Sequence, residues 1–191
     1  MAREIAGVAY LLVPLLGAAL LHGTFMKYGW LAFLARPMDF GRTFRGRPLF
    51  GHSKTFRGPI LVAIGAQAIF AVQQDVLHAI PFFAAIELVD YASLPVWLGA
   101  LAGGVAELAE LPNSFTKRQL GIAPSATAKG PRAVLFYLWD QLDVLTGYWI
   151  AVAYFVPATP LRVGISIALV GGIHPLLTVI GYLLGMRSTM R

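Results

Sequence analysis

The chain has 191 residues, of which 58% are hydrophobic and only 13% are charged, and its mean hydropathy is +0.70. These values exclude an ordinary soluble domain and predict one compact integral membrane domain spanning residues 1–191. The net charge of +6 lies in short loops between apolar runs, which favours lipid headgroups or phosphates over nucleic acid as partners. Cysteine is absent, so disulfides and thiolate metal sites are excluded.

Five apolar runs follow one another along the chain, each near the roughly 20 residues that cross a bilayer as a helix. They cover residues 5–34, 59–74, 94–111, 133–156 and 163–185. We therefore predict an all-α integral membrane protein with about five transmembrane helices. The first run continues towards Leu34 without a convincing cleavage site, so we do not interpret it as a signal peptide. Its far end, interrupted by Lys27 and Gly29, is expected to be a kink or an interfacial segment. The role of residues 75–93, which are amphipathic, stays open.

The charges of the loops predict the orientation in the membrane. Twelve of the fifteen Lys and Arg residues fall on one side if five segments are threaded in sequence. They lie in residues 35–58, in residues 112–132 and in the C-terminal tail at Arg187 and Arg191. By the positive-inside rule this side is cytoplasmic and the N-terminus is outside. The sequence thus predicts two cytoplasmic basic loops in a lipid bilayer.

The first basic loop combines glycines with side chains that bind phosphate. Over residues 38–58 it reads MDFGRTFRGRPLFGHSKTFRG. Lys54, Thr55 and Arg57 offer donors suited to phosphate oxygens. An ordinary positive-inside loop with turn glycines explains the same pattern, so both interpretations stay open. The loop is not a Walker-type phosphate loop, because its glycine spacing does not match and no strand precedes it.

Pro112 directly follows the third apolar run and is expected to break or kink the helix there. Asn113 or Ser114 could then cap the next turn and present backbone N–H groups to an anion. If a helix resumes, Ser114, Lys117 and Arg118 share one face beside the acidic residues. A membrane helix that ends in a snorkelling Lys-Arg pair accounts for these two cations equally well.

Two pairs of carboxylates lie within or at the ends of apolar runs. Glu107 and Glu110 are three residues apart, as are Asp140 and Asp143, and residues at this spacing share a helix face. A charge near the middle of a membrane helix costs about 2.5–3.5 kcal/mol, so such residues are rare without a task. Two facing acidic pairs would repel each other unless a cation lay between them. This pattern predicts a site for a hard divalent cation such as Mg²⁺, with structural ion pairing as the alternative.

The four histidines give weaker signals. His52 lies in the basic loop, where it could contact a phosphate. We expect packing or interfacial positions for His22, His78 and His174. The spacing of histidines and carboxylates fits neither a zinc protease nor a catalytic triad.

Three strings occur in a recognisable order: LFGHSKTFRG at residues 49–58, SFTKRQLGI at 114–122 and DQLD at 140–143. Together they resemble the CDP-archaeol synthase family, which belongs with the membrane-bound CTP-dependent phosphatidate cytidylyltransferases. The likeness covers about residues 37–145, and residues 174–185 resemble the last helix of the family. Five membrane helices are what the resemblance implies. This chain departs from the family in three residues, which are Glu110 for an Asp, Ala109 for a Gly and Phe56 for a Trp.

The resemblance implies Mg²⁺-dependent transfer of CMP from CTP to a membrane lipid phosphate, giving a CDP-lipid and pyrophosphate. Mg²⁺ would be held by Glu110, Asp140 and Asp143. The nucleotide would be bound by Lys54, Thr55, Arg57, Ser114, Lys117 and Arg118. The residues expected to act in catalysis are Lys117, Arg118, Asp140 and Asp143. The active site would lie in the cell membrane and face the cytoplasm, and CTP is available in the cytoplasm.

Two other functions stay open on the sequence alone. A phosphatidate cytidylyltransferase that makes CDP-diacylglycerol would present the same phosphate to the same residues. A small membrane transporter or lipid-binding accessory protein would need polar residues that continue across the membrane, and the first, second and fifth runs offer few. The oligomeric state is also open, and a homodimer is compatible with the sequence.

Overall fold

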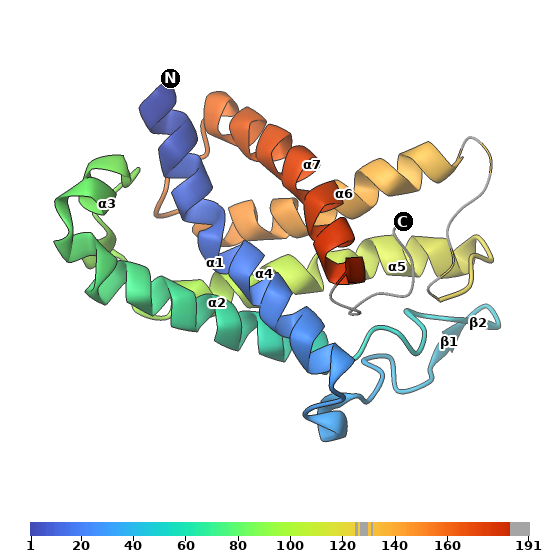
Figure 1. The fold of residues 1–191 in the computed structure, drawn as a ribbon. Helices are drawn as coiled ribbons and strands as arrows, with labels where there is room; N and C mark the ends of the chain where they lie inside the picture. The colour runs from blue at the N-terminus through green and yellow to red at the C-terminus, as the bar shows by residue number, and fades with distance from the viewer. Residues whose placement is uncertain (125, 127–129, 131, 184–191) are drawn as a thin grey trace.

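The computed structural model describes residues 1–124, 126, 130 and 132–183, without the side chains of residues 174–178, 180 and 181 (Figure 1). Its regular elements are helices apart from one hairpin of two-residue strands, which confirms the predicted all-α class. The α-helices are α1 (Ala2–Lys27), α2 (Arg57–Asp75), α3 (Pro81–Ile86), α4 (Leu98–Leu108), α5 (Glu110–Gln119), α6 (Arg132–Val152) and α7 (Pro160–Leu183). The hairpin strands are β1 (Thr43–Phe44) and β2 (Arg47–Pro48), and 3₁₀ turns cover Ala32–Leu34, Leu77–Ala79 and Tyr91–Ser93.

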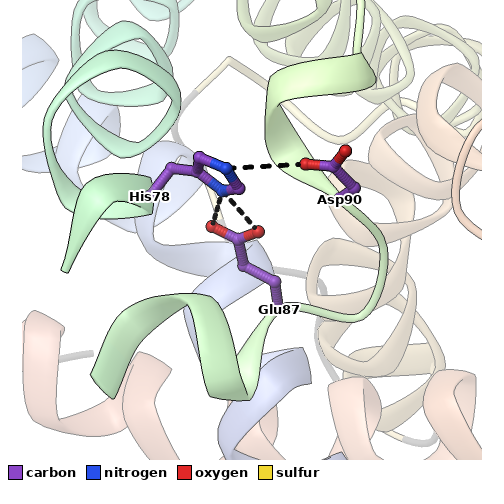
Figure 2. A group of neighbouring side chains, drawn as sticks. All are labelled: His78, Glu87 and Asp90. Atoms are coloured by element: carbon purple, nitrogen blue, oxygen red, sulfur yellow. Dashed lines mark hydrogen bonds and ion pairs between the residues drawn. The ribbon is translucent and has the colours of Figure 1, made fainter. Parts of the chain in front are cut away.

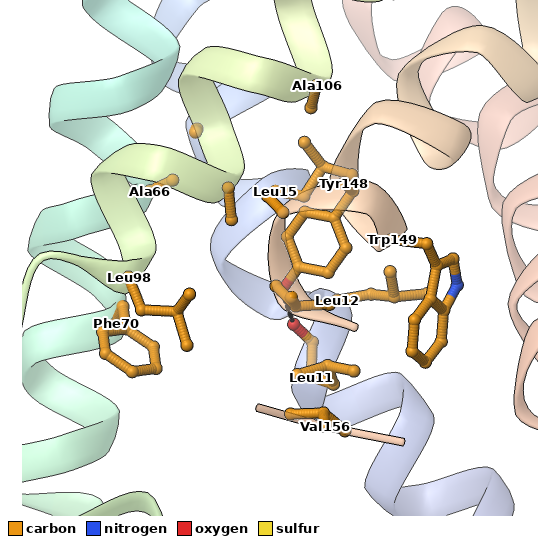
Figure 3. Packing of buried hydrophobic residues seen from close by; sticks show 14 of the residues in the cluster. Leu11, Leu12, Leu15, Ala66, Phe70, Leu98, Ala106, Tyr148, Trp149 and Val156 are labelled. Atoms are coloured by element: carbon orange, nitrogen blue, oxygen red, sulfur yellow. Dashed lines mark hydrogen bonds between the residues drawn. The ribbon is translucent and has the colours of Figure 1, made fainter. Parts of the chain in front are cut away.

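Five of the helices make a closed ring of pairwise contacts. In this ring α1 packs on α2, α2 on α4, α4 on α6, α6 on α7, and α7 on α1. The interior is filled by apolar side chains, among them Leu12, Ala66 and Leu98 (Figure 3). Tyr148 of α6 lies in this core and donates its hydroxyl to the backbone carbonyl of Leu11 in α1. Because the polar tip has a partner, this large ring can be buried at little cost.

Two helices are long and apolar enough to cross a membrane, namely Ala2–Lys27 and the continuous stretch Arg57–Ala79. They correspond to the first two predicted runs, and the second reaches into residues 75–93 by one 3₁₀ turn. The helix over Pro160–Ile173 is apolar but shorter. The third run is divided between α4 and α5, so its longest helix has only 11 residues. The protein thus has the apolar helices of a membrane protein, and the count of five spans stays a prediction.

The helix break expected near Pro112 lies three residues before the proline, at Ala109. A proline ring collides with the carbonyl of the residue four positions earlier, which here is Leu108, the last residue of α4. Pro112 itself falls in the first turn of α5, where its missing N–H needs no partner. Consequently Asn113 and Ser114 lie inside α5, and the prediction that one of them caps a helix is wrong.

Glycines let α4 approach its neighbours closely. Gly99 and Gly103 are four residues apart and face α2, where a Cβ on Gly103 would lie 2.6 Å from the carbonyl oxygen of Val62. On the other side, a Cβ on Gly147 of α6 would lie 2.6 Å from the carbonyl oxygen of Val105. Small residues at this spacing are the usual means by which membrane helices pack backbone to backbone. The position of α6 relative to α4 therefore depends on Gly147.

The two basic segments lie at the same end of the bundle (Figure 1). The guanidinium of Arg47 donates to the backbone carbonyl of Gln119, and the Gln119 amide donates to the carbonyl of Pro48 at 3.3 Å. The Phe44 and Phe115 rings pack nearby with centroids 5.8 Å apart. The hairpin loop and α5 thus form one charged surface, and the compartment that it faces stays a prediction. Lys129, Arg187 and Arg191 lie outside the described residues.

We predict that Gly103→Ala lowers the thermal stability of the detergent-solubilised protein, since the new methyl group collides with the backbone of α2. Gly104→Ala is the matched control, because its Cβ would meet only the Ala63 Cβ at an ordinary 3.7 Å. Alanine is favoured over glycine in a helix by about 1 kcal/mol, so the control should be neutral or stabilising. Equal melting temperatures for the two variants would contradict this packing.

Candidate active site

A cavity of about 460 Å³ opens between the basic end of the bundle and its apolar core. Its inner wall is apolar and includes Leu15 and Leu16 of α1 and Val170 of α7. Its polar wall is formed by Lys54, Thr55, Glu107, Glu110, Asp140 and Gln141. A cavity with one ionic wall and one apolar wall fits an amphiphile with a charged headgroup.

Asn113 joins the two aspartates of α6. Its amide Nδ2 donates to Asp140 Oδ1 at 2.6 Å and to Asp143 Oδ2 at 2.9 Å. The geometry follows from the helix break at Ala109. Gly147, one turn after Asp143 in α6, contacts Ala109. Asn113, one turn after Ala109 in α5, therefore faces Asp143. Asn113 and Asp143 are 2% and 6% exposed, whereas the side chain of Asp140 is 47% exposed.

Two lysines neutralise the carboxylates at the cavity. Lys54 from the basic loop forms an ion pair with Glu110, and Lys117 of α5 forms one with Asp140. Lys117 also lies 5.5 Å from the centre of the Phe136 ring, a cation–π contact. Burial lowers the pKa of Lys54, although the carboxylates of Glu107, Asp143 and Asp140 oppose the shift. The acidic pairs are thus balanced by cations from two segments far apart in sequence.

The two predicted arginines are buried with donors left over. Arg57 begins α2, is 6% exposed and contacts the sulfur of Met26 at 3.2 Å, while its Nε has no partner. Arg118 is also 6% exposed and contacts the carbonyl of Ser114, and its Nη1 has no partner. A buried N–H without an acceptor costs about 1–3 kcal/mol, so both groups would gain from an anionic ligand. Neither arginine lines the cavity, and nor does Ser114.

Asp39 organises the basic loop. Its carboxylate accepts N–H bonds from Gly41 at 2.9 Å, Phe50 at 3.0 Å and Gly51 at 2.8 Å, and the residue is 4% exposed. Burial alone would raise the pKa of Asp39, but the backbone donors outweigh it and hold the pKa below its ordinary value. Gly51, held in this way with φ +88°, packs against the side chain of Arg118. The loop is therefore fixed where it meets α5.

The donor set around Asp140 and Asp143 fits a hard divalent cation. Two carboxylates converge on one donor atom, the Nδ2 of Asn113, and the Oδ1 of the same buried amide has no partner. Glu110 is turned towards Lys54 rather than towards the aspartates. The structure thus brings together Asp140 and Asp143 of the predicted metal ligands. Glu110 lines the polar wall of the cavity together with Asp140, whereas Asp143 is not among the lining residues.

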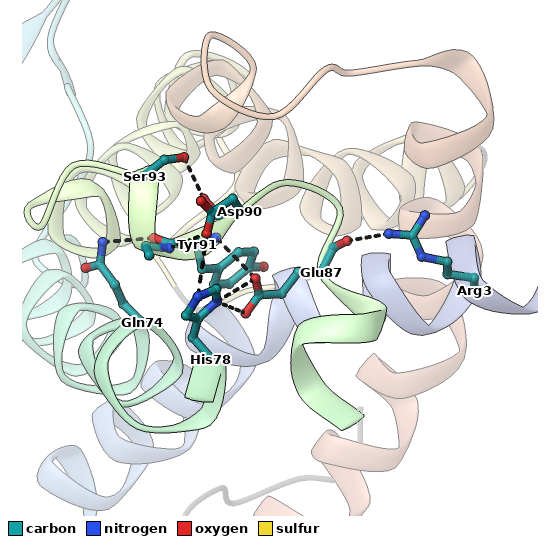
Figure 4. A network of polar contacts seen from close by, with 8 residues as sticks. Arg3, Gln74, His78, Glu87, Asp90, Tyr91 and Ser93 are labelled. Carbon is teal, nitrogen blue, oxygen red and sulfur yellow. Dashed lines mark hydrogen bonds and ion pairs between the residues drawn. The ribbon is translucent and has the colours of Figure 1, made fainter. Parts of the chain in front are cut away.

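A second polar cluster lies at the opposite end of α2 (Figures 2 and 4). His78 Nδ1 lies 3.0 Å from Glu87 Oε2, and His78 Nε2 lies 3.7 Å from Asp90 Oδ1. Arg3 of α1 donates to the backbone carbonyl of Glu87 at 3.1 Å. Within the described residues this is the one group of three His, Cys, Asp or Glu side chains whose ligand atoms lie within 4.8 Å of one another. Both imidazole nitrogens face carboxylates, so the contacts tie the turn after α2 to the segment before α4.

Three residues of the site were not among those predicted to act. Asn113 could have been found, because Glu110, Asn113 and Lys117 fall on one face of a helix. Asp39 has a local signal as well, since Asp followed two residues later by Gly is typical of an Asx turn. His22, expected to be a packing residue, lies in the cavity wall. No spacing in the sequence indicated its position.

The sequence model of the family CarS-like, described as CDP-archaeol synthase, matches residues 10–190. A CDP-archaeol synthase of Methanoculleus marisnigri is 30% identical over 80% of this chain and 87% of its own length. One from Halobacterium salinarum is 33% identical over 83% of this chain and 84% of its own length. One from Pyrococcus furiosus is 37% identical, but the match spans 49% of this chain and about half, 52%, of that protein. No solved structure shows a significant match.

We predict that Asp39→Asn increases hydrogen exchange of the amides of Gly41, Phe50 and Gly51 by at least roughly tenfold at neutral pH, since bonds to a charged acceptor contribute about 1.5–3 kcal/mol. Because the pKa of Asp39 is lowered in the folded protein, its stabilising effect is present above about pH 4. In the wild-type protein it should be lost only as the pH falls through the folded pKa. Asp75→Asn, at an exposed position, is the control. Unchanged exchange in the Asp39 variant would show that the carboxylate does not hold the loop.

Proposed function

The chain belongs to the CDP-archaeol synthase family, and we propose that it is a single membrane-embedded domain that transfers CMP from CTP to a lipid phosphate. The products are a CDP-lipid and pyrophosphate. One observation carries the proposal beyond the family: the carboxylates of Glu110 and Asp140 line the polar wall of the cavity, and each is paired with a lysine. The same charges can be redistributed onto a metal nucleotide without leaving any of them unpaired.

The redistribution follows from the ion pairs. When the triphosphate enters, Lys54 and Lys117 exchange their carboxylate partners for phosphate oxygens, which accept stronger, charge-assisted bonds. The carboxylates of Glu110 and Asp140 can bind a divalent cation without the nucleotide, and they bind it more strongly once the lysines no longer compete for them. Arg57 and Arg118 each have a buried N–H available for a phosphate oxygen. Thr55 follows Lys54 in the chain, and Ser114 lies one helical turn before Lys117 and Arg118. These two residues complete the set of donors that we assign to CTP.

Asp140, Asp143 and Glu110 would hold Mg²⁺. A divalent cation held there would supply positive charge to offset the negative charge of the triphosphate and of the pyrophosphate leaving group. The lipid phosphate is itself an anionic nucleophile, so no residue is needed to remove a proton. The protein positions two phosphates against each other and neutralises their repulsion. Lys117, which pairs with Asp140, and Arg118, the next residue in the chain, are the cations that we assign to this role.

The apolar wall of the cavity would bind the hydrocarbon chains of the lipid substrate. Leu15, Leu16 and Leu20 of α1, with Val170 of α7, would contact the chains while the phosphate lies among the cations. An ether-linked archaeal lipid such as a di-O-geranylgeranylglyceryl phosphate is our first choice, because the relatives are CDP-archaeol synthases. Phosphatidate is the alternative, since the headgroup contacts would be the same.

The other observations favour an enzyme over a transporter. In the described residues the cluster that fills the helix ring is apolar, as Leu12, Ala66 and Leu98 illustrate, which does not suit an ion path. We place the basic end at the cytoplasmic surface of the cell membrane, because CTP is in the cytoplasm and the loop charges agree with it. A homodimer stays a prediction of the sequence alone.

We predict that Asp140→Asn and Asp143→Asn each reduce Mg²⁺-dependent formation of CDP-lipid by about 10²–10³-fold, the typical loss when one electrostatic stabiliser of a transition state is removed. Both variants should insert and fold, since asparagine keeps the shape of aspartate. The assay uses purified protein, CTP, Mg²⁺ and a panel of ether-linked and ester-linked lipid phosphates. Asp75→Asn serves as a control for the loss of an exposed carboxylate. Near-normal turnover of either site variant with every lipid would rule out the aspartates as the metal site.

A further inference from the structure

The side chain of Asn113 combines two features that are unusual together. It is 2% exposed, and its Nδ2 is shared between Asp140 and Asp143. Its Oδ1, on the same amide, is buried without a hydrogen-bond partner. A buried amide oxygen without a donor costs about 1–3 kcal/mol, so the environment of this side chain is only half satisfied.

The orientation of the amide is determined by its neighbours. With the nitrogen towards the aspartates, both carboxylates receive a donor, whereas the reverse orientation would direct an oxygen at two other oxygens. A cation among these oxygens reverses that preference, because an amide oxygen is a good ligand for a hard cation and an NH₂ group is not. Rotating the amide by half a turn exchanges two atoms of nearly equal size, so the packing around it can stay the same.

The distances agree with this exchange. An octahedral Mg²⁺ holds its ligands at about 2.0–2.1 Å, which puts neighbouring ligand oxygens about 2.9 Å apart. After rotation the Asn113 oxygen would take the place of Nδ2, which lies 2.6 Å and 2.9 Å from the aspartate oxygens. The Asn113 oxygen would then lie at the separation of adjacent octahedral ligands from each of the two aspartate oxygens.

We propose that Asn113 is a further metal ligand of this site, whose amide turns so that Oδ1 joins Asp140 and Asp143 around the divalent cation. The inference rests on the proposed function, because it takes the two aspartates to be metal ligands. It gives the Leu111-Pro112-Asn113 stretch before Ser114 a specific role. Asn113 would donate a hydrogen bond to each aspartate in one orientation of its amide and bind the cation in the other.

The test is the affinity for Mn²⁺, measured from the electron paramagnetic resonance of the free ion with purified protein and no CTP or lipid. Asn113→Leu keeps the branching at Cγ and removes both polar atoms, and it should weaken Mn²⁺ binding roughly tenfold or more. Asn113→Asp restores a ligand oxygen without a donor and should bind Mn²⁺ at least as tightly as the wild type. Gln119→Leu removes an amide from the same helix and should change nothing.

Each other pattern overturns the proposal. If the amide only donates to the aspartates and competes with the cation, Asn113→Leu will bind Mn²⁺ as well as the wild type or better. If it serves only to orient the aspartates by donation, Asn113→Asp will also bind more weakly. Asp143→Asn separates this inference from the proposed function, since undiminished Mn²⁺ binding in that variant would remove the aspartate site itself. Thermal unfolding of each variant shows that the protein is folded at the temperature of the titration.

Discussion

The chemistry that we propose depends on the contact between α5 and α6 through Asn113, Asp140 and Asp143. The contact can form because α4 ends at Leu108 and a new helix starts at Glu110. This break is needed because the Pro112 ring would collide with the Leu108 carbonyl in a continuous helix. The two helices are brought close because Gly147 lets α6 approach the backbone of α4 one turn away. Four carboxylates that would be unfavourable inside an apolar bundle are thereby collected at one end of it.

This arrangement separates the bundle into two chemical environments. At the charged end, cations from the basic loop and from α5 lie against the carboxylates, and Asp39 fixes the loop through three backbone bonds. Below it, the ring of helices encloses an apolar interior. The cavity joins the two environments, as a site for a nucleotide and a lipid phosphate requires. The cluster of His78, Glu87 and Asp90 lies at the other end of α2 and is not part of this site.

Much of this could be predicted from the sequence, because periodic and compositional signals are local. The apolar runs, the helix break before Pro112 and the family of the chain follow from such signals. The partner of each charge could not be predicted, since Lys54 meets Glu110 and Lys117 meets Asp140 only after three helices have packed. For the same reason Asn113 was expected to be a helix cap, although it is buried between two aspartates. The number of membrane spans depends on where helices end, which hydropathy places only approximately.

The most direct test of the central claim follows the phosphorus atoms of CTP. Purified protein is incubated with Mg²⁺, an ether-linked lipid phosphate and CTP that carries ³²P at the α position or at the γ position. Transfer of CMP predicts that α label appears in the lipid fraction and that γ label leaves as pyrophosphate. Label from the γ position in the lipid would indicate a kinase instead. If neither label appeared in the lipid with any lipid phosphate tested, the result would contradict the account.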